Sequence, residues 1–563
     1  MSAIRPARGW PAILPMRRKG KGDGGYVATA LVLAALVAMP FLALVWLAVS
    51  GASSNWSHLA TTILPEASLV TAELMLGVAL LTGTMGVVTA WLVASFEFPG
   101  RRLFSWALVL PLAVPTYIAA YAFVEFLHFA GPVQTAIRAL FGYSSSRDYW
   151  FPEIRSLPGA VLILSSVLYP YVYLTVRMVF LMQGRKAADV ARTLGASQAT
   201  IFLRILLPLA RPAIAVGVTL ALMEAVNDIG AVEFLGVRTL TFAVYSTWLN
   251  RGDLYGATQI ALLMLAVIVL LVTVERLARR QQRFTLGRSD RPQPGSERLA
   301  GGRAFLATAA CALPIVLGFG IPFLILGDYG LRRLDQLADP QLWRAFRNTV
   351  ALASITGLVT VTAGFLLAYG VRLTGSKRLV LMTRLAVLGY AVPGTVLAIG
   401  ILIPLAGLDN FVDARMRETF DVSTGLLLSG SGFAIVYAGF VRFMAMGHGS
   451  LESGFAKLSP HLDMAARTLG RAPGATLVEV LLPLMRPALL TAFLLVFVEA
   501  SKELSATILL RPFDFETLAT FVYAQTSRSA FEEGAVAALL IVLVGILPVA
   551  ILNRSILAET ARS

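Results

Sequence analysis

One segment of this chain occurs twice, at an interval that does not drift. In the first copy Gly195 is followed by Ile-x-Leu-Pro, which ends at Pro208, and in the second copy Gly470 is followed by Val-x-Leu-Pro, which ends at Pro483. Both pairs of residues are 275 positions apart (470 − 195 and 483 − 208). The chain is therefore built from two copies of one structural unit, and any fold for the first half must also hold for the second.

The composition identifies the environment of these two units. The chain has 563 residues, of which 57% are hydrophobic and 14% are charged, and its mean hydropathy is +0.75. Soluble domains carry roughly a quarter of charged residues. The sequence therefore predicts an all-α integral membrane protein.

Twelve apolar stretches reach about the 20 residues that a helix needs to cross a bilayer. The predicted spans lie near residues 26–50, 69–95, 104–128, 157–182, 210–236 and 255–277 in the first half, and near 304–327, 346–370, 380–406, 423–447, 485–510 and 533–553 in the second. The first could be a cleaved secretory signal, but its apolar stretch is too long for one, so we expect an uncleaved anchor.

Lys and Arg are concentrated on alternate sides of the spans, and cytoplasmic loops hold an excess of them. The predicted tail, residues 1–25, is rich in both, whereas the first loop, residues 51–68, has neither. This pattern predicts cytoplasmic N- and C-termini. Both repeated segments then lie on the cytoplasmic side, and six spans per unit make the two halves parallel repeats.

The same topology accounts for the net charge of +15, so no nucleic-acid partner is expected. The single Cys311 and four scattered histidines form no metal-binding pattern. Residues 278–303 are rich in Arg, Gly, Ser and Pro and are predicted to be a cytoplasmic linker between domains at 26–277 and 304–563.

The repeated segments, residues 186–208 and 462–483, are predicted to form a short polar helix, a turn at the glycine and a second helix that continues into a span. Small alanines permit close approach of the first helix to a neighbour. Prolines follow where a membrane helix starts, a position that tolerates them. An ordinary amphipathic connection would explain one copy, but two copies in register make that explanation weak.

The spacing of these segments resembles the Glu-Ala-Ala loop of permeases of binding-protein-dependent ABC importers. The resemblance extends over nearly the whole chain and implies the type I importer permease fold. It also implies that each loop docks on one of two copies of an ABC ATPase subunit, which binds ATP and Mg, and that a periplasmic binding protein delivers the substrate. The residues that the resemblance places in the docking loops are Asp189, Ala191, Gly195, Pro208, Asp463, Met464, Ala465, Ala466, Gly470 and Pro483.

Two positions depart from the family pattern. Asp189 replaces the usual glutamate in the first copy and Met464 replaces it in the second, although Asp463 is adjacent. The second loop is therefore expected to dock without the acidic contact.

The segments around residues 222–232 and 499–513 resemble the fused ferric-iron permeases. Thiamine, polyamine and phosphonate permeases share the general plan, so they remain alternatives for the substrate.

Four carboxylates repeat with the same period as the loops. Glu224 and Asp228 share one helix face, and Glu499 and Glu503 repeat this spacing at matching positions of the second half. Ionisable side chains inside a membrane usually face a cavity or a partner, and hard cations prefer oxygen ligands. We expect these residues to line the substrate pathway, although no metal site is assigned.

The alternative for the carboxylates is that Lys502 or Arg511 neutralises them in a packed interface. Pro115 and Pro393 occupy matching spans and are expected to kink them.

The chain shows no phosphate-binding loop for ATP, because Ser376 and Lys377 stand in the wrong order and no strand precedes them. It also shows no catalytic cluster, so the expected role is a transport subunit without enzymatic activity. A transporter driven by an ion gradient is the alternative from another class. It would not need paired docking loops.

Overall fold

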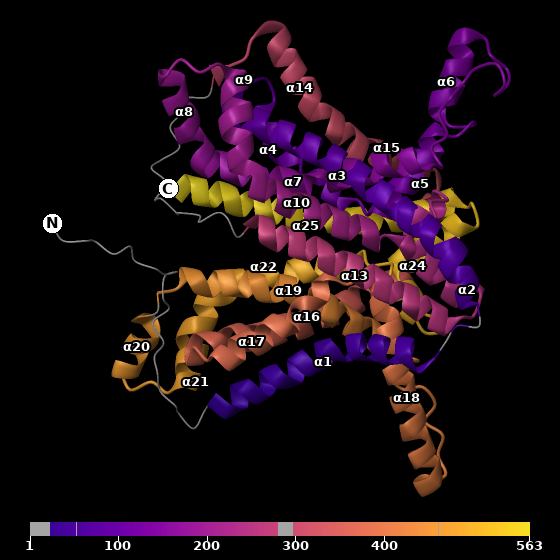
Figure 1. Cartoon of the computed structure of the whole chain (residues 1–563), viewed down its shortest axis with the longest axis vertical. Helices are drawn as coiled ribbons and strands as arrows, with labels where there is room; N and C mark the ends of the chain where they lie inside the picture. The colour runs from indigo at the N-terminus through magenta and orange to yellow at the C-terminus, as the bar shows by residue number, and fades with distance from the viewer. Residues whose placement is uncertain (1–22, 52, 54, 280–296, 460, 563) are drawn as a thin grey trace.

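The computed structural model describes residues 23–51, 53, 55–279, 297–459 and 461–562 (Figure 1). Helices dominate these residues, and the strands among them are one short parallel pair, β1 (Phe96–Glu97) with β2 (Glu297–Arg298). The all-α fold is as predicted. Most of the predicted N-terminal tail and linker lies outside the described residues.

The predicted spans have helices at all twelve places. The helices concerned are α1 (Asp23–Ser50), α3 (Leu64–Ser95), α4 (Arg101–Ala107) with α5 (Thr116–Leu127), α7 (Leu157–Val179), α10 (Leu207–Asn227), α13 (Leu254–Arg279), α14 (Gly301–Ile315) with α15 (Ile321–Arg332), α16 (Pro340–Thr374), α17 (Lys377–Ala386) with α18 (Gly394–Phe420), α19 (Phe433–Lys457), α22 (Leu482–Ser501) and α25 (Phe531–Arg562).

Fewer than twelve of these helices pass a strict test of length and composition. Among the described residues nine are long and apolar enough to cross a membrane, and a bent pair is a tenth candidate. α19 falls outside this group and carries Arg442 and His448 in its middle. The side chains of α25 are described only as far as Ile546.

Two prolines break spans at matching places, as predicted. Pro115 and Pro393 each follow a short 3₁₀ turn and precede the first residue of a helix. At Pro115 the chain bends by 95° between Arg101–Ala113 and Thr116–Phe141. Proline causes such breaks because it lacks the N–H that a continuous helix requires.

The predicted boundaries of two spans are wrong. The sequence predicts the ninth span near 380–406, but Pro393 divides it, and α18 then continues to Phe420. It predicts the tenth near 423–447, but residues 421–432 are not helical and α19 begins at Phe433. Apolar residues within the loop imitate the start of a span.

The two halves contain matching three-helix groups. α3, α7 and α10 pack together in the first half, and α16, α19 and α22 pack together in the second, as the upper and lower parts of Figure 1 show. Glycines allow the close contacts: a Cβ on Gly217 of α10 would lie 2.6 Å from the Cα of Val172 in α7. Small residues at helix crossings are the usual means of close packing in membranes.

The first helix of each half lies against the other half. α1 packs along α17 and α18, and the Tyr437 hydroxyl of α19 donates a hydrogen bond to the Leu36 carbonyl of α1 (2.5 Å). In return, α15 packs on α5, and Gly318 approaches the Ser166 carbonyl of α7 so closely that a Cβ would be 2.0 Å from it. The halves are thus interleaved.

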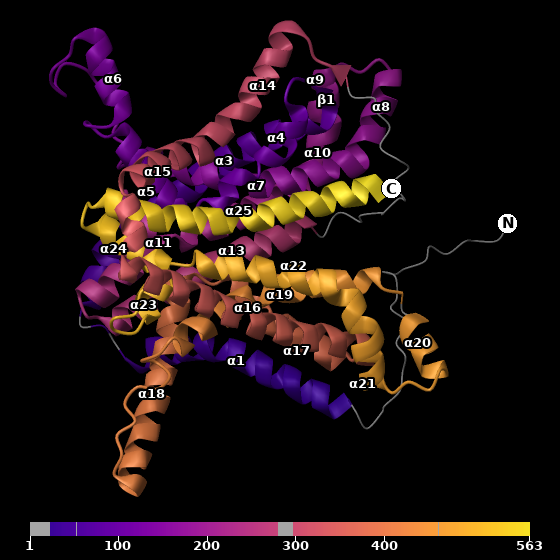
Figure 2. The same cartoon turned by 180° about the vertical axis from the view of Figure 1, so that it is seen from behind.

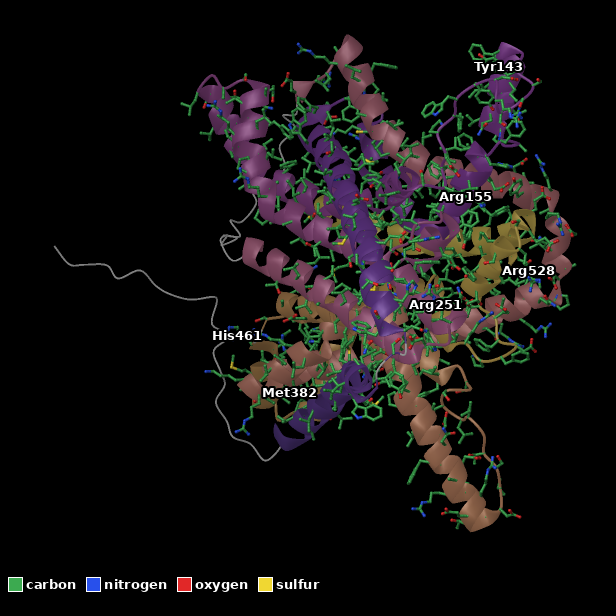
Figure 3. All side chains as sticks on the ribbon, turned by 45° about the vertical axis from the view of Figure 1, so that its right-hand side comes forward. Tyr143, Arg155, Arg251, Met382, His461 and Arg528 are labelled. Carbon is green, nitrogen blue, oxygen red and sulfur yellow. The ribbon has the colours of Figure 1, made fainter. Side chains whose placement is uncertain are left out.

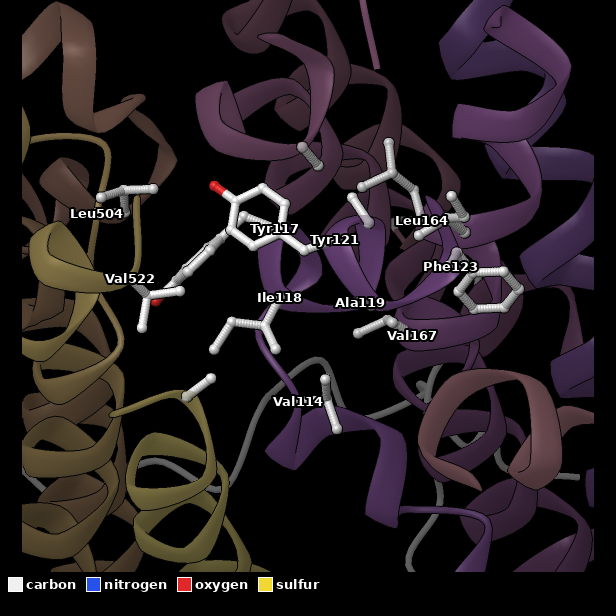
Figure 4. Close-up of a cluster of buried hydrophobic side chains, with 14 of the residues drawn as sticks. Val114, Tyr117, Ile118, Ala119, Tyr121, Phe123, Leu164, Val167, Leu504 and Val522 are labelled. Carbon is white, nitrogen blue, oxygen red and sulfur yellow. The ribbon is translucent and has the colours of Figure 1, made fainter. Parts of the chain in front are cut away.

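α5 lies at the centre of the largest buried cluster. Its side chains Ile118, Ala119 and Phe123 are fully enclosed, and the cluster continues into Leu504 and Val522 of the second half (Figure 4). Apolar packing therefore joins the two halves next to the position where the long helices α10 and α22 end.

Candidate functional site

A cavity of about 70 Å³ lies between the two halves, where α10 and α22 end. Its walls include all four carboxylates predicted for the substrate pathway, namely Glu224, Asp228, Glu499 and Glu503. Pro115 and Tyr117 line it from the first half as well. The structure therefore brings the four repeated acids into one site at the interface.

Asp228 and Glu503 have a structural task in this site. Asp228 accepts a hydrogen bond from the Ala231 N–H (2.8 Å) and caps α11 (Ile229–Phe234). Glu503 accepts hydrogen bonds from the N–H groups of Ala506 (2.8 Å) and Thr507 (3.0 Å), next to α23 (Thr507–Leu510). A helix start leaves N–H groups without partners, and a side-chain oxygen satisfies them. The repeated acids thus hold two equivalent breaks in the long helices.

Glu224 and Glu499 lie one turn earlier, on α10 and α22, and each meets a basic group. A terminal guanidinium nitrogen of Arg442 is 3.6 Å from Glu224 Oε2, and another is 3.0 Å from Glu503 Oε1. Lys502 Nζ is 2.8 Å from Glu499 Oε1. Arg442 belongs to α19, so its contact with Glu224 joins the two halves.

The balance of charge in the cavity is negative. Four carboxylates face two basic groups, Arg442 and Lys502, which leaves two negative charges in excess when all six are ionised. Lys502 does contact Glu499, as the alternative expects, whereas Arg511 pairs with Glu516 outside the cavity. Neutralisation is therefore partial.

The described residues contain no group of three or more His, Cys, Asp or Glu side chains close enough to hold a metal ion. The four acids line the cavity as two pairs, Glu224 with Asp228 and Glu499 with Glu503, without forming a set of metal ligands among the described residues.

Further polar contacts join the halves beside the cavity. The Asn227 amide oxygen accepts a hydrogen bond from the Gly394 N–H (2.6 Å), and the Ser505 hydroxyl donates one to the Asn227 carbonyl (2.8 Å). Within α11, Glu233 accepts a hydrogen bond from the Tyr523 hydroxyl of α24 (Leu518–Ser527) at 2.6 Å. The halves are thus closed together on this side of the cavity.

The repeated loops lie at the other end of the molecule, which we term the coupling end. They comprise α8 (Arg185–Thr193) with α9 (Gln198–Ile201), and α20 (His461–Thr468) with α21 (Pro473–Thr476). Gly195 and Gly470 separate the helices of each pair, and their φ angles of 81° and 77° are left-handed, which favours glycine. Figure 1 shows α8 and α20 at the left, on opposite sides of the midline.

The predicted docking residues differ in accessibility. Ala191 and Ala466 are buried against their own chain, with 7% and 6% of their surfaces exposed, while Asp189, Met464 and Ala465 are exposed. Pro208 and Pro483 lie in the first turns of α10 and α22. A partner would therefore meet the outer faces of α8 and α20 rather than the two buried alanines.

A pair of leucines outside the predicted set of docking residues lies at these faces. Leu194 and Leu469, which occupy matching positions of the two loops, are 82% and 81% exposed. Their position directly before Gly195 and Gly470 could have identified them from the sequence, because a leucine at a polar turn has no hydrophobic core in which to be buried. They give the two loops the same apolar tip.

Asp463 has no acidic counterpart at the matching position of the first loop. It pairs with Arg372 of α16, whose Nε and terminal nitrogen lie 3.1 and 2.8 Å from its Oδ2. Ala188 occupies the matching position of the first loop, and Asp189 pairs within its own helix, with Arg192 at 3.1 Å. Asp463 is therefore engaged inside the chain, which leaves Met464 as its exposed neighbour.

Comparisons with known proteins agree with this geometry. Residues 84–283, which run from α3 through the first loop to α13, match the family described as "Binding-protein-dependent transport system inner membrane component". The Fe(3+)-transport system permease protein FbpB 2 of Haemophilus influenzae is 24% identical over 494 residues, which is 87% of this chain and 90% of that protein.

Shorter relatives match parts of the chain. The molybdenum transport system permease protein ModB of Escherichia coli K12 is 27% identical over 36% of this chain and 88% of its own length. The sulfate transport system permease protein CysW of the same strain is 34% identical over 26% of this chain and 48% of its own length. With its all-α membrane fold, two repeated loops and interfacial cavity, the chain is similar to the inner membrane components of binding-protein-dependent transport systems, whose family model matches residues 84–283.

Proposed function

We propose that this chain is the permease subunit of an ABC importer that moves ferric iron across the bacterial inner membrane. The acidic cavity between the halves is the observation that carries the proposal. A periplasmic binding protein delivers the substrate at the side where Glu233 meets Tyr523, and ATP binding and hydrolysis with Mg in two ATPase subunits act on α8 and α20.

The charge of the cavity favours a cation over the oxyanions named for other relatives. Sulfate would meet a cavity whose four carboxylates outnumber its two basic groups, and like charges within a few ångströms repel strongly where water is scarce. Hard cations prefer oxygen ligands such as carboxylates. The iron permease relative, which matches most of this chain, supports the same choice.

Arg442 and Lys502 have a place in this mechanism. In the structure Arg442 pairs with Glu224 and Lys502 pairs with Glu499, so each of these two carboxylates has a basic partner within the chain. An arriving cation takes over these carboxylates and releases the two basic side chains. Because Arg442 joins the halves through Glu224, its release also loosens their contact, which links substrate passage to the movement of the halves.

The test is uptake by the reconstituted complex with Glu224→Gln and Glu499→Gln. Each change removes a charge but keeps the shape of the side chain, so we expect uptake to fall about tenfold or more, equivalent to ~1.4 kcal/mol or more in the barrier. ATP hydrolysis should remain coupled to the binding protein. Glu452→Gln is the matched control, since Glu452 is an exposed carboxylate on α19 outside the cavity. Undiminished uptake in both cavity variants would contradict the proposed pathway.

A second measurement separates the substrates. Binding proteins loaded with ferric iron, thiamine, a polyamine, a phosphonate, sulfate or molybdate are added to the complex, and ATP hydrolysis is followed. Stimulation by the ferric form supports the proposal, and stimulation only by another form identifies that substrate instead. Uptake by the chain alone, driven by a proton gradient, would favour a secondary transporter.

A further inference from the structure

Two arms leave the bundle at the end opposite the coupling loops. The first arm is residues 128–156, with α6 (Pro132–Phe141), and the second is residues 407–432, which include the end of α18. Figures 1 and 2 show them on opposite flanks, running across the direction of the long helices. In Figure 3 Tyr143 marks the tip of the first arm, far from His461 at the start of α20.

The first arm has a built internal structure. The Tyr149 hydroxyl donates to the Gln134 side chain (2.6 Å), which in turn donates to the Leu127 carbonyl (2.7 Å). Asp148 accepts hydrogen bonds from the N–H groups of Ser145 (2.7 Å) and Ser144 (2.8 Å), and these bonds hold its pKa below the ordinary value. The return loop is thus fixed against α6.

The second arm uses the same construction with other residues. Asp409 accepts hydrogen bonds from the N–H groups of Leu428 (2.9 Å) and Ser429 (2.8 Å). Asp413 accepts one from the Thr424 N–H (2.7 Å) and pairs with Arg417 (2.7 Å). Two carboxylates therefore fasten the return loop along the exposed end of α18.

Both arms expose large apolar side chains despite this order. Leu140 and Phe141 of the first arm are 80% and 67% exposed, and Trp150 of its return loop is 86% exposed. On the second arm Phe411 and Phe420 are 59% and 65% exposed. The arms are amphipathic, because Val133, Ala136, Ile137, Leu140 and Phe141 recur at helical spacing on α6, as Leu408, Val412, Met416 and Phe420 do on α18.

The helices at the roots of the arms indicate the environment of these exposed side chains. α15, which packs on α5 at the root of the first arm, exposes Leu324, and α1, which packs on α18 at the root of the second, exposes Trp46 and Val49. Such flanks of a membrane bundle face lipid. The arms extend outward from these lipid-facing flanks. An amphipathic helix that lies in the plane of the membrane and carries Trp, Phe and Arg is suited to the boundary between headgroups and acyl chains.

We propose that the two arms lie in the lipid interface of the leaflet opposite the coupling end, with Phe141, Trp150 and Phe420 inserted among the acyl chains. The arms brace the two halves from opposite flanks, so each moves with the root of its own half, α5 or α18. The surface over the cavity, between the two arms, then remains accessible to the binding protein.

The experiment uses the complete transporter in phosphatidylethanolamine and phosphatidylglycerol vesicles. Cys311 is fully buried and has no disulfide partner among the described residues, so Cys311→Ala gives a cysteine-free background. Phe141→Cys and Phe420→Cys are labelled with an environment-sensitive fluorophore, and the lipids carry a nitroxide on the acyl chain. Ser146→Cys and Glu418→Cys, at exposed polar positions of the same arms, are the matched controls, and Glu418 lies on the face of α18 opposite the apolar stripe. ATP hydrolysis by each labelled complex verifies its assembly.

We expect the fluorophores at 141 and 420 to be quenched several-fold more strongly than those at 146 and 418, without any binding protein. Equal and weak quenching at all four positions would overturn the proposal. So would a signal at 141 and 420 that changes only when the loaded binding protein is added, because the arms would then be its docking surface.

Discussion

Arg372 shows how one side chain makes the two halves unequal. Besides Asp463, it donates hydrogen bonds to the carbonyls of Phe455 (3.0 Å), Leu458 (3.3 Å) and Ser459 (3.1 Å), which lead from α19 to α20. The planar guanidinium suits this set because it presents five donors in a fixed fork. The second coupling helix is thus fastened to α16, and the first lacks an equivalent contact at Ala188.

We predict that Arg372→Ala loosens the second coupling loop selectively. The variant loses charge-assisted hydrogen bonds, each worth about 1.5–3 kcal/mol, and leaves Asp463 without its partner. Hydrogen exchange should rise in residues 459–470 and stay unchanged in residues 185–201, while uptake falls. Arg471→Ala is the control, since its pair with Glu479 is exposed and such pairs contribute about 0–1 kcal/mol. Equal exchange in both variants would refute the role of Arg372.

The sequence predicts the repeated carboxylates but not their basic partners. Glu224, Asp228, Glu499 and Glu503 can be found because periodicity marks them in both halves. Arg442 and Arg372 have no such mark, since neither recurs at the matching position of the first half. Arg442 could have been found as a lone arginine within an apolar span, a position that usually signals a functional group. Which acid it meets depends on where α19 lies relative to α10 across the interface between the halves, which the sequence does not encode locally.

At the scale of elements, the coupling loops combine a constant shape with a variable face. Both use a left-handed glycine, and both bury an alanine just before it, at Ala191 and Ala466. Both then present a leucine, Leu194 or Leu469, at the tip. The shape followed from the sequence because glycine and alanine have strict steric uses. The solvent exposure of each face could not be predicted from the sequence, because it depends on side chains from distant segments of the chain.

We predict that Leu194→Asp and Leu469→Asp weaken the association with the ATPase subunits. Burying an apolar side chain at an interface stabilises it by about 1.5–3 kcal/mol, and a buried unpaired charge opposes it further. Co-purification of the ATPase and its stimulated activity should both fall. Thr193→Ala and Thr468→Ala, at the adjacent exposed positions, should leave them unchanged. A normal complex with both aspartates would show that the tips do not dock.

The arms mark the limit of prediction at this scale. Residues 423–432 are apolar enough to resemble the start of a span, so the sequence predicts a span over them, whereas it predicts a loop over the charged end of α18. Asp409 and Asp413 turn this segment back along α18 through hydrogen bonds over 11 to 20 residues. Periodicity reports which face is apolar, but it does not report whether a helix crosses the bilayer or lies along it.

At the scale of the whole molecule, the halves are joined most firmly on the side of the cavity away from the coupling end. Tyr523 of the second half donates to Glu233 of the first at 2.6 Å, and its hydroxyl lies 3.2 Å from that of Tyr245 in α12 (Leu240–Tyr245). In the proposed alternating-access cycle these contacts would break when the side away from the coupling end opens. We therefore expect them to favour the state in which that side is closed.

We predict that Tyr523→Phe raises ATP hydrolysis in the absence of substrate. A hydrogen bond to a charged group contributes about 1.5–3 kcal/mol, so its loss shifts the balance toward the open outer side by about tenfold or more. Tyr169→Phe is the control, since the buried Tyr169 hydroxyl has no hydrogen-bond partner among the described residues. The same basal rate in both variants would show that the Glu233 contact does not hold the outer side closed.

The interleaving of the first helices has a consequence for how the chain is made. α1 leaves the ribosome first, but the helices against which it rests, α17 and α18, are synthesised only after the first half is complete. The first half is therefore inserted with one flank still uncovered, and it completes its packing only when the second half arrives. Joining the halves in one polypeptide turns this late step into an encounter within a single molecule, so each newly made half finds its own partner.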